Sequence, residues 1–438
     1  MDVRQLENVV NSLVSEYKNF ELARTILDSF EDKLKTIEEH EIVSEICKTI
    51  NHHTLRLKCL KFAYTHCINS EKLSPYRYEL AKTYKFLNEP EKSLFYNDID
   101  YRNDNSNFYT QIERVSFLNA LGKPEEADSL VEKMYPQNKE EKVHLSQFIG
   151  KKQLRNGDLD MGIKNSILAE KGLYSNLVPY RYWTGVEETG KTVIVHGRGD
   201  ISDQFSYLRF FKRFKELNMQ PVFYSAYIEK RNDILEIYKR HGIDAIDNTN
   251  LFTKDFLWVN LSALPAYFQL EEETLWEGPY LTSIKNLKNK IEDDKFKIGI
   301  KLTSDRVKNN GYIRDIPVRE FFDSLPENVS VYNFDSEKYD NCNNLRGRIE
   351  SWDDTLDYID QMDLVISCDT SLAHAAGAMG KNTIVMTSID PSYFYITNRQ
   401  DKTTPWYGTN FNIVKQKTVR DWNEPLQEMK ELIHICMK

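Results

Sequence analysis

Three stretches of this 438-residue chain place acids, hydroxyls and cations directly after short apolar runs. Asp200 follows two closely spaced glycines, and Asp369 precedes a threonine and a run of alanines. Between them in the chain, a turn that carries lysine, threonine and serine begins at Lys301. Carboxylates accept protons, and hydroxyls together with cations hold anions, so these residue types predict proton transfer beside a bound anion.

The first stretch is "VHGRGDISDQF", residues 195–205. Its glycines allow a tight turn after a strand, and Asp200 then stands near the start of the next helix. Two interpretations compete. Asp200 is either the N-cap of that helix or a general base at the floor of a cleft, where it takes a proton from an acceptor hydroxyl.

The second stretch is "IKLTSDRVKNNGYIRDIP", residues 300–317. A strand opens into hydroxyls and cations, a combination that suits a diphosphate; they are Lys301, Thr303, Ser304, Lys308 and Arg314. The alternative is an ordinary solvated loop. It is not a Walker A loop, because the chain contains no G-x-x-x-x-G-K-[ST] sequence.

The third stretch, "ISCDTSLAHAAGAMGKNTIVM", runs from Ile366 to Met386. Asp369 and Thr370 fall at a strand-to-helix corner, and Ser371 begins a slim helix of alanines and glycines. The N–H groups at such a helix start attract an anion. His374 lies one turn along and reaches the same place, unless it is a core histidine with its hydrogen bonds satisfied internally.

These corners require a scaffold of alternating strands and helices, and the chain from Lys191 onward supplies one. Short β-branched runs alternate with helical patterns in two modules, about 180–285 and 295–400, followed by an amphipathic closing helix. This alternation predicts two doubly wound parallel sheets. Ligands of such folds bind at the carboxyl ends of the strands, where the three stretches fall.

The first part of the chain repeats itself instead. Asn88, Gly122 and Gly157 recur in similar contexts about 34 residues apart, and the small residues Ser93, Ala127 and Gly162 recur in the same way. The equivalent small positions further upstream are Cys59 and Ala23. Such a period predicts stacked helix pairs that present a concave surface to a partner. The alternative is an irregular helical domain.

Composition restricts the functional classes. The formal net charge is −9, so the chain as a whole lacks the positive charge of a nucleic-acid-binding protein. None of the six cysteines forms a C-x-x-C pair. We therefore expect free thiols in a reducing cytoplasm and no metal site, including among the histidines and cysteines of residues 52–67. We also expect no signal peptide and no membrane span.

The third stretch, with the preceding "LDYIDQMDLV", resembles the sugar-nucleotide half of heptosyltransferase-type glycosyltransferases. More closely, the chain resembles bacterial proteins that join tetratricopeptide repeats to such a domain. The matching pattern is Asp369, Thr370 and Ser371 followed by His374. Further similar segments occur in the expected order over about residues 180–430, among them "GRGDISDQFSYLRFF", "FKIGIKLTS", "RDIP" and "TTPWYGTNFNIVKQ".

The resemblance implies an α/β protein, with an N-terminal α-helical repeat array followed by a GT-B glycosyltransferase fold of two Rossmann-like domains. The implied domains are helical repeats at 1–175, an acceptor domain at 176–290 and a nucleotide-sugar domain at 291–438. It implies an inverting, metal-independent transfer from a nucleotide-sugar to an acceptor hydroxyl, with no cofactor. The expected acceptor is a glycan, a protein or a modified DNA base, and the repeats offer a surface for a protein partner.

In this resemblance Asp200 is the catalytic base, and Gly199, Ser202 and Gln204 lie on the acceptor side. Nucleotide-sugar binding falls to Lys301, Thr303, Ser304, Arg314, Asp369, Thr370, Ser371 and His374. Two departures stand out: His196-Gly197-Arg198 replaces a usual glutamate–glutamine pair, and Lys-Leu-Thr replaces a frequent Trp-Ala-Gly. Two alternatives therefore stay beside the transferase, namely a viral enzyme that glycosylates hydroxylated DNA bases and a non-catalytic repeat scaffold with a degenerate GT-B domain.

Overall fold

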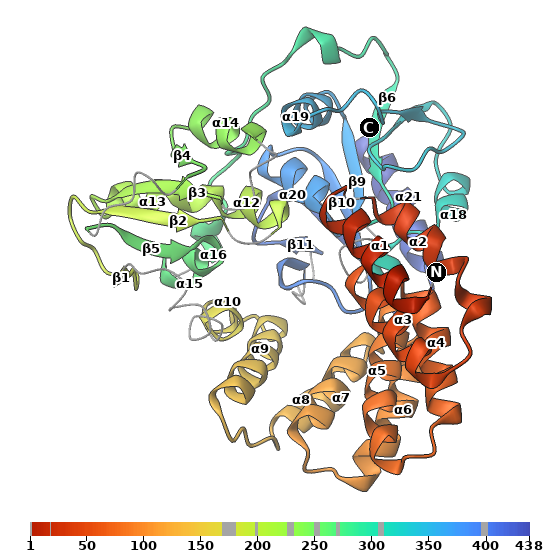
Figure 1. Cartoon of the computed structure of the whole chain (residues 1–438). Coiled ribbons are helices and arrows are strands. Elements are labelled where there is room, and N and C mark those ends of the chain that lie inside the picture. Colours follow the sequence, from red (N-terminus) through yellow and green to blue (C-terminus); the bar gives the residue numbers. More distant parts are fainter. Residues whose placement is uncertain are drawn as a thin grey trace.

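The structure is a computed structural model of the whole chain (Figure 1). It describes residues 2–17, 19–168, 181–197, 200–225, 232–248, 255–268, 272–304, 311–395 and 402–438. Gly199 and Lys308, which the sequence places near the site, lie outside the described residues. In the described part of the chain, no helix is long and apolar enough to cross a membrane.

The N-terminal region is a curved array of antiparallel helices, drawn from red to yellow in Figure 1. Consecutive helices pair off, and each pair contacts the next, because a short amphipathic helix buries its apolar face only against neighbours. The helices are α1 (Val3–Ser15), α2 (Phe20–Asp28), α3 (Ile37–Thr49), α4 (His53–His66), α5 (Leu73–Phe86), α6 (Pro90–Asn103), α7 (Phe108–Ala120), α8 (Pro124–Val131), α9 (Lys139–Arg155) and α10 (Leu159–Ile163).

The turns inside these pairs explain the period of the sequence. Asn88, Gly122 and Gly157 all have positive φ, between 59° and 85°, and Asn51 joins them with φ 54°. Glycine and asparagine adopt this left-handed conformation most readily, which ends one helix and allows the next to return. The predicted small residues Ser93 and Ala127 have no exposed side-chain surface, as expected where helices approach closely. The helix-pair architecture expected for the N-terminal region is therefore observed.

The first α/β module is built on a five-stranded parallel sheet in the order β1-β5-β2-β3-β4. Its strands are β1 (Arg181–Tyr182), β2 (Thr192–His196), β3 (Gln220–Tyr224), β4 (Asp244–Ile246) and β5 (Leu257–Asn260). The helices around it are α12 (Ile201–Tyr207), α13 (Phe211–Glu216), α14 (Asn232–Arg240), α15 (Leu264–Tyr267) and α16 (Glu272–Leu275). A 3-10 turn at Leu208–Phe210 separates α12 from α13, and there the Nε of Arg209 donates to the carbonyl of Ser206.

The second module holds a seven-stranded sheet in the order β11-β12-β10-β9-β6-β7-β8, parallel except for the β11–β12 pair. Its strands are β6 (Phe296–Lys301), β7 (Val329–Asn333), β8 (Asn343–Asn344), β9 (Leu364–Cys368), β10 (Thr383–Thr387), β11 (Thr403–Thr404) and β12 (Gly408–Lys415). Its helices are α17 (Gly311–Arg314), α18 (Val318–Asp323), α19 (Trp352–Asp360), α20 (Ser371–Ala378) and α21 (Asn423–Cys436). Ser351 caps α19 and forms a capping box with Asp354.

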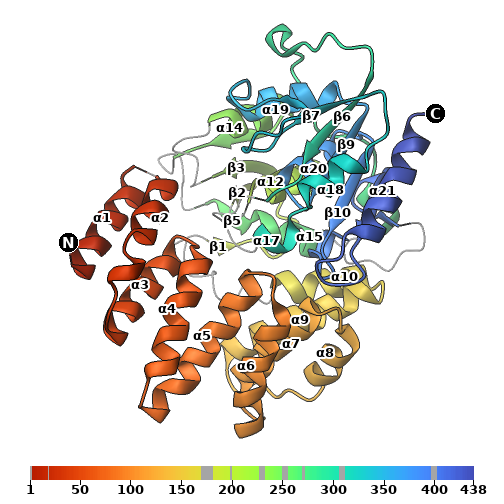
Figure 2. The ribbon, with the colours of Figure 1, turned by 90° about the vertical axis from the view of Figure 1, so that its right-hand side faces the viewer.

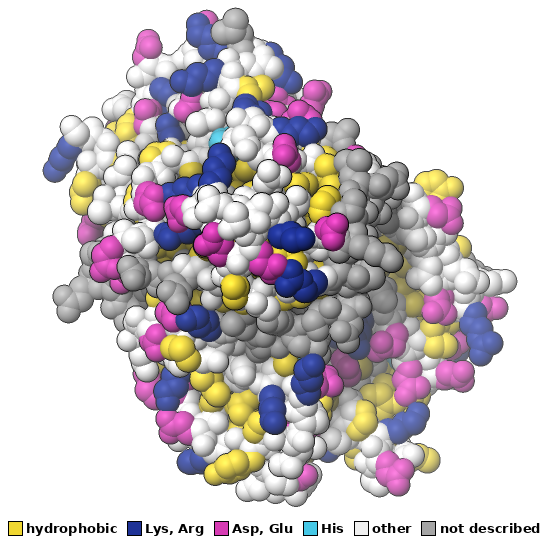
Figure 3. Space-filling view, turned by 90° about the vertical axis from the view of Figure 1, so that its left-hand side faces the viewer, with side chains coloured by type: hydrophobic (Ala, Val, Ile, Leu, Met, Phe, Trp, Pro, Cys, Tyr) yellow, Lys and Arg dark blue, Asp and Glu magenta, His cyan; other side chains and the backbone are white. Residues whose placement is uncertain are grey.

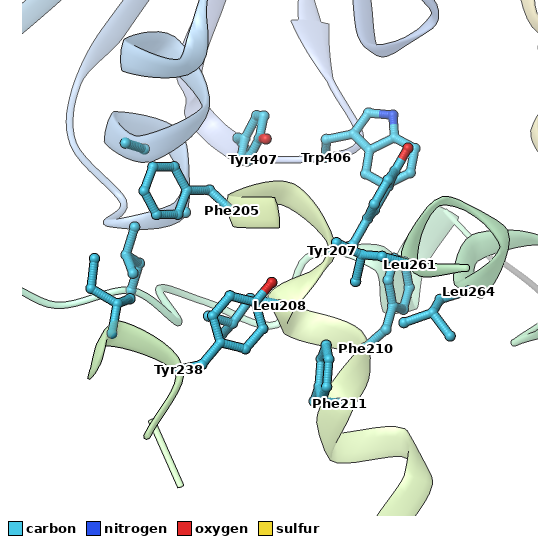
Figure 4. Packing of buried hydrophobic residues seen from close by; sticks show 14 of the residues in the cluster. Phe205, Tyr207, Leu208, Phe210, Phe211, Tyr238, Leu261, Leu264, Trp406 and Tyr407 are labelled. Carbon is cyan, nitrogen blue, oxygen red and sulfur yellow. The ribbon is translucent and has the colours of Figure 1, made fainter. Parts of the chain in front are cut away.

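The two modules share one hydrophobic core. Aromatic and aliphatic side chains from α12 and the turn after it pack against Trp406 and Tyr407 of the second module (Figure 4). Arg209 lies buried in this contact, where its Nη1 donates to the carbonyls of Leu275 and Trp406 at 2.9 and 2.5 Å. Its guanidinium also lies 4.6 Å from the ring centre of Tyr280.

The repeat array contacts both modules (Figures 1 and 2). Leu154 and Ile163, near its C-terminal end, belong to the core of the first module. Helices α6 and α9 reach the second module through polar contacts, among them Lys151 Nζ to Asp390 Oδ1 at 2.5 Å and Arg420 Nη2 to Glu91 Oε1 at 2.8 Å. The predicted fold class, a helical array followed by two Rossmann-like domains in a GT-B arrangement, is thus confirmed.

Candidate functional site

The second and third predicted stretches meet because their strands are neighbours. β6 pairs with β9 in parallel register, with Lys301 opposite Ser367. The carboxyl ends of both strands, and the residues after them, therefore lie at one edge of the sheet. Arg314 joins the two stretches directly, since its Nη1 donates to the backbone carbonyl of Asp369 at 3.1 Å.

The hydroxyls and the lysine of the second stretch bind carboxylates of the protein itself. Asp335, which sequence reasoning missed, accepts from Lys301 Nζ at 3.1 Å and from Thr303 Oγ1 at 2.7 Å. It also accepts from the backbone N–H of Leu302 at 2.7 Å and from the Tyr339 hydroxyl at 2.9 Å. Burial, and then proximity to this carboxylate, raise the pKa of Tyr339. Lys301 and Thr303 thus fix the shape of the turn around a buried aspartate.

Ser304 is held in the same way by a second carboxylate that the sequence analysis did not single out. Its backbone N–H and its hydroxyl reach Asp315 Oδ1 at 2.9 and 3.4 Å. Arg314, in contrast, bonds directly to a residue of the third stretch, Asp369. A strand-end rule could have found Asp335, because it follows β7 as Asp369 follows β9.

Asp369 and Thr370 form the corner that leads into α20. The side chain of Asp369 is buried, which raises the pKa of its carboxyl group, and the neighbouring Arg314 opposes that rise. Thr370 occupies the N-cap position without a side-chain capping bond, and its Oγ1 lies 2.9 Å from Ser367 Oγ. Thr370 and Ser371 are half-buried. The start of α20 therefore keeps N–H groups that its own N-cap side chain does not satisfy.

His374 lies in the contact between the two modules, away from open space. Its Nδ1 is 2.9 Å from Ser206 Oγ on α12 and 2.6 Å from the Tyr407 hydroxyl, and its Nε2 is 3.1 Å from the Tyr395 hydroxyl. Burial, with the charges of Arg209 and Arg314, lowers the pKa of His374 to about 3. The imidazole is therefore neutral, and both nitrogens have partners within the protein, which matches the core-histidine interpretation.

Asp200 stands at the N-cap position of α12, and its side chain makes no capping hydrogen bond to that helix. Its side chain is exposed, so the carboxylate is accessible to a ligand. The two other described residues of the predicted acceptor side are less accessible. Ser202 is half-buried, and Gln204 is buried with its Nε2 3.4 Å from the carbonyl of Gly197.

A cavity of about 180 Å³ opens at the carboxyl ends of β9, β10 and β12, and we call it the strand-end cavity. Arg314 and Asp369 line it on the sheet side, where Ser388 and Gln416 join them. Lys85 and Asn88 line it from the repeat array. Sequence reasoning missed these two residues, since nothing in a single repeat indicates which residues contact a domain 200 or more positions away.

The surface carries both signs of charge. On the face shown in Figure 3, Lys and Arg side chains are interspersed with Asp and Glu. A groove for nucleic acid would need clustered positive charge, which this face does not offer in its described residues. Within the described residues, no group of three or more His, Cys, Asp or Glu side chains is arranged to hold a metal ion. All six cysteines are free thiols.

No family model matches the chain, and no curated protein matches it. Several solved structures show limited similarity to the chain, among them the following three transferases. A glycosyl transferase of family 9 from Veillonella parvula is 9% identical, with 58% of this chain and 98% of that chain covered and a TM-score of 0.42. The ADP-heptose LPS heptosyltransferase II of E. coli is 11% identical, with 56% and 98% covered and a TM-score of 0.35. An O-GlcNAc transferase from Thermobaculum terrenum is 10% identical, with 92% and 94% covered and a TM-score of 0.36. At TM-scores below 0.5, these likenesses carry no argument about the chemistry of this chain.

Proposed function

We propose that the protein is a glycosyltransferase that moves a sugar from a nucleotide-sugar donor to an acceptor hydroxyl. The observation that carries this proposal is the strand-end cavity, where Arg314 meets Asp369 at the carboxyl ends of parallel strands, two residues before α20 begins. Doubly wound folds bind nucleotides at this edge, and a helix start beside an arginine favours a diphosphate. The sequence resemblance to heptosyltransferase-type enzymes supports the same assignment.

Glycosyl transfer needs a base for the acceptor hydroxyl and positive charge for the departing diphosphate. Asp200 is our candidate base because its carboxylate is exposed and makes no capping bond. Arg314 and the N–H groups of α20 are the candidates that stabilise the diphosphate as it leaves. With this set the transfer proceeds in one displacement, which inverts the anomeric centre and needs no metal ion.

The test is a panel of nucleotide sugars, read by thermal shift and by nucleotide release. We expect at least one donor to raise the melting temperature and to release its nucleotide slowly in water. Arg314→Gln and Thr370→Val should lower the affinity for that donor. Asp200→Asn should abolish transfer and leave the affinity for the donor nearly unchanged. If no nucleotide sugar stabilises the protein or is consumed, the enzyme assignment is wrong. Unchanged turnover in Asp200→Asn would remove that residue from the mechanism.

A further inference from the structure

A second and larger cavity lies between the repeat array and the second module, and we call it the repeat-facing cavity. Its volume is about 450 Å³, within the usual range for small-molecule sites. The ends of α7 and α9 form one wall, through Asn119 and Arg155. The other wall comes from β11, β12 and α21 of the second module, which Figure 2 shows in blue above the repeats. A short segment around Asp390 borders both this cavity and the strand-end cavity.

Positive charge exceeds negative charge in the lining of this cavity. Four cations, Arg155, Lys402, Lys415 and Lys417, face two carboxylates, Asp390 and Glu428. Most of the cations have partners: Arg155 pairs with Asp128, Lys402 with Glu428 and Lys417 with Glu424. Asp390 pairs with Lys151, which lies nearby on α9.

Lys415 differs from the other cations of the lining. It makes no ion pair with any described residue, although Asp390 lies close enough to act on its charge. Burial and the neighbouring charges of Lys151 and Arg155 lower the pKa of its ammonium group. An added anion would raise the pKa of this ammonium group again, because opposite charge favours the charged form of lysine.

A buried amide beside Lys415 also indicates a ligand in this cavity. Gln416 has 3% of its surface exposed, and its Nε2 has no hydrogen-bond partner among the described residues. A buried donor without an acceptor costs free energy that a ligand oxygen would recover. Gln416 lines the repeat-facing cavity, so a ligand there can supply that oxygen.

We infer that the repeat-facing cavity binds a small phosphate-bearing ligand, held by Lys415 and Gln416 between the repeats and the second module. A phosphate group carries up to two negative charges and three acceptor oxygens, which suits a lysine, an arginine and an amide converging on one cavity. The site borders the proposed donor site, because Gln416 lines both cavities, whereas Lys415 lines only the repeat-facing cavity and Arg314 only the strand-end cavity. The inference does not need the transferase assignment.

Inorganic pyrophosphate is the probe, and calorimetric titration of the full chain at low ionic strength is the measurement. The titration is run in an Arg314→Gln background, which disables the proposed donor site without touching the repeat-facing cavity. We expect binding there to weaken at least about fivefold with Lys415→Gln and with Gln416→Leu, and to weaken as salt rises. Glu428→Gln removes a carboxylate from the lining and should tighten binding.

Lys142→Gln is the matched control, because Lys142 is exposed on α9 outside the cavity lining, and it should leave the affinity unchanged. The inference is overturned if the Arg314→Gln protein binds no pyrophosphate, or if the lysine and glutamine variants bind as tightly as their parent. Binding of citrate but not of pyrophosphate would likewise refute a phosphate ligand. Because three variants of opposite expected sign are compared, misfolding of one of them does not decide the result.

Discussion

At the residue scale, Asp335 binds side chains that the sequence assigns to a ligand, namely those of Lys301 and Thr303. Its carboxylate is fully buried and accepts from a lysine, a threonine hydroxyl, a tyrosine hydroxyl and backbone N–H groups. Buried carboxylates with several donors shape a loop strongly, since each donor would otherwise be unsatisfied. Lys301 and Thr303 therefore hold the turn after β6 around a carboxylate of the protein itself.

Asp335→Ala should lower the free energy of unfolding by about 3 kcal/mol, because it leaves Lys301 and two hydroxyls without their buried acceptor. Urea unfolding at neutral pH measures the change. Asp340→Ala, at an exposed aspartate five residues further along, should change stability by less than about 0.5 kcal/mol. Equal effects of the two substitutions would show that the Asp335 cluster does not stabilise the turn.

His374 gives stability a pH dependence whose sign follows from its burial. Its pKa falls to about 3 in the folded protein from an ordinary value of 6.5, so the unfolded chain binds more protons between these values. Stability should therefore fall as the pH drops below 6.5, by about 2 kcal/mol between pH 7 and pH 5. The raised pKa of the Asp369 carboxyl, 3.9 Å away, contributes with the opposite sign.

The comparison with His374→Gln isolates this contribution, since Asp369 and the other buried histidines, His40 and His53, are present in both proteins. The variant should lose less stability than the parent over the same interval in urea titrations at the two pH values. His434→Gln changes an exposed histidine on α21 and should keep the parental pH dependence. A His374→Gln protein with the parental pH dependence would contradict a buried neutral imidazole.

At the element scale, glycines within the helices of the array, as well as those in the turns, allow neighbouring helices to approach closely. Gly150 lies within α9, and a Cβ there would stand 2.6 Å from the carbonyl oxygen of Gly162 and 2.7 Å from the backbone nitrogen of Ser166. Gly162 in turn lies against Leu154. The backbones of α9 and the following segment thus pack without an intervening side chain.

Gly150→Ala separates helix propensity from packing because the two effects have opposite signs. Alanine should stabilise an isolated helix by about 1 kcal/mol relative to glycine, whereas the backbone clash should cost about 1–3 kcal/mol. We expect net destabilisation, measured by thermal unfolding. Lys142→Ala, on the exposed face of the same helix, should be nearly neutral. A stabilised Gly150→Ala protein would mean that the helices separate easily.

Local patterns allowed the elements, but not their contacts, to be predicted. The strand ends and the recurring positions Asn88, Gly122 and Gly157 follow from residues close in sequence, and the structure has these strands and places all three positions in left-handed turns. β12 was not predicted as a strand. Its sequence mixes polar and apolar residues, and it forms a strand through its pairing with β10. Lys85 at the strand-end cavity and Ser206 beside His374 depend on packing between distant segments, which one sequence does not reveal.

At the scale of the whole molecule, the two Rossmann-like domains are joined by a core that includes a buried arginine. Arg209 donates to carbonyls from Leu275 and Trp406, and its Nη2 donates to the Tyr280 hydroxyl at 2.6 Å. Leu275 and Tyr280 precede the second sheet in sequence, whereas Trp406 lies between its strands β11 and β12. Arg209 therefore couples the unfolding of one domain to that of the other.

Arg209→Met should keep much of the apolar volume but leave the carbonyls of Leu275 and Trp406 without a donor. We expect a loss of about 3–5 kcal/mol, and a calorimetric transition that broadens or splits as the domains unfold more independently. Lys212→Met, which removes an exposed partner of Glu277 one turn away, is the control and should shift stability by less than about 1 kcal/mol without splitting the transition. If Arg209→Met unfolds in one sharp transition at the parental temperature, the apolar contacts in Figure 4 suffice to join the domains without the arginine.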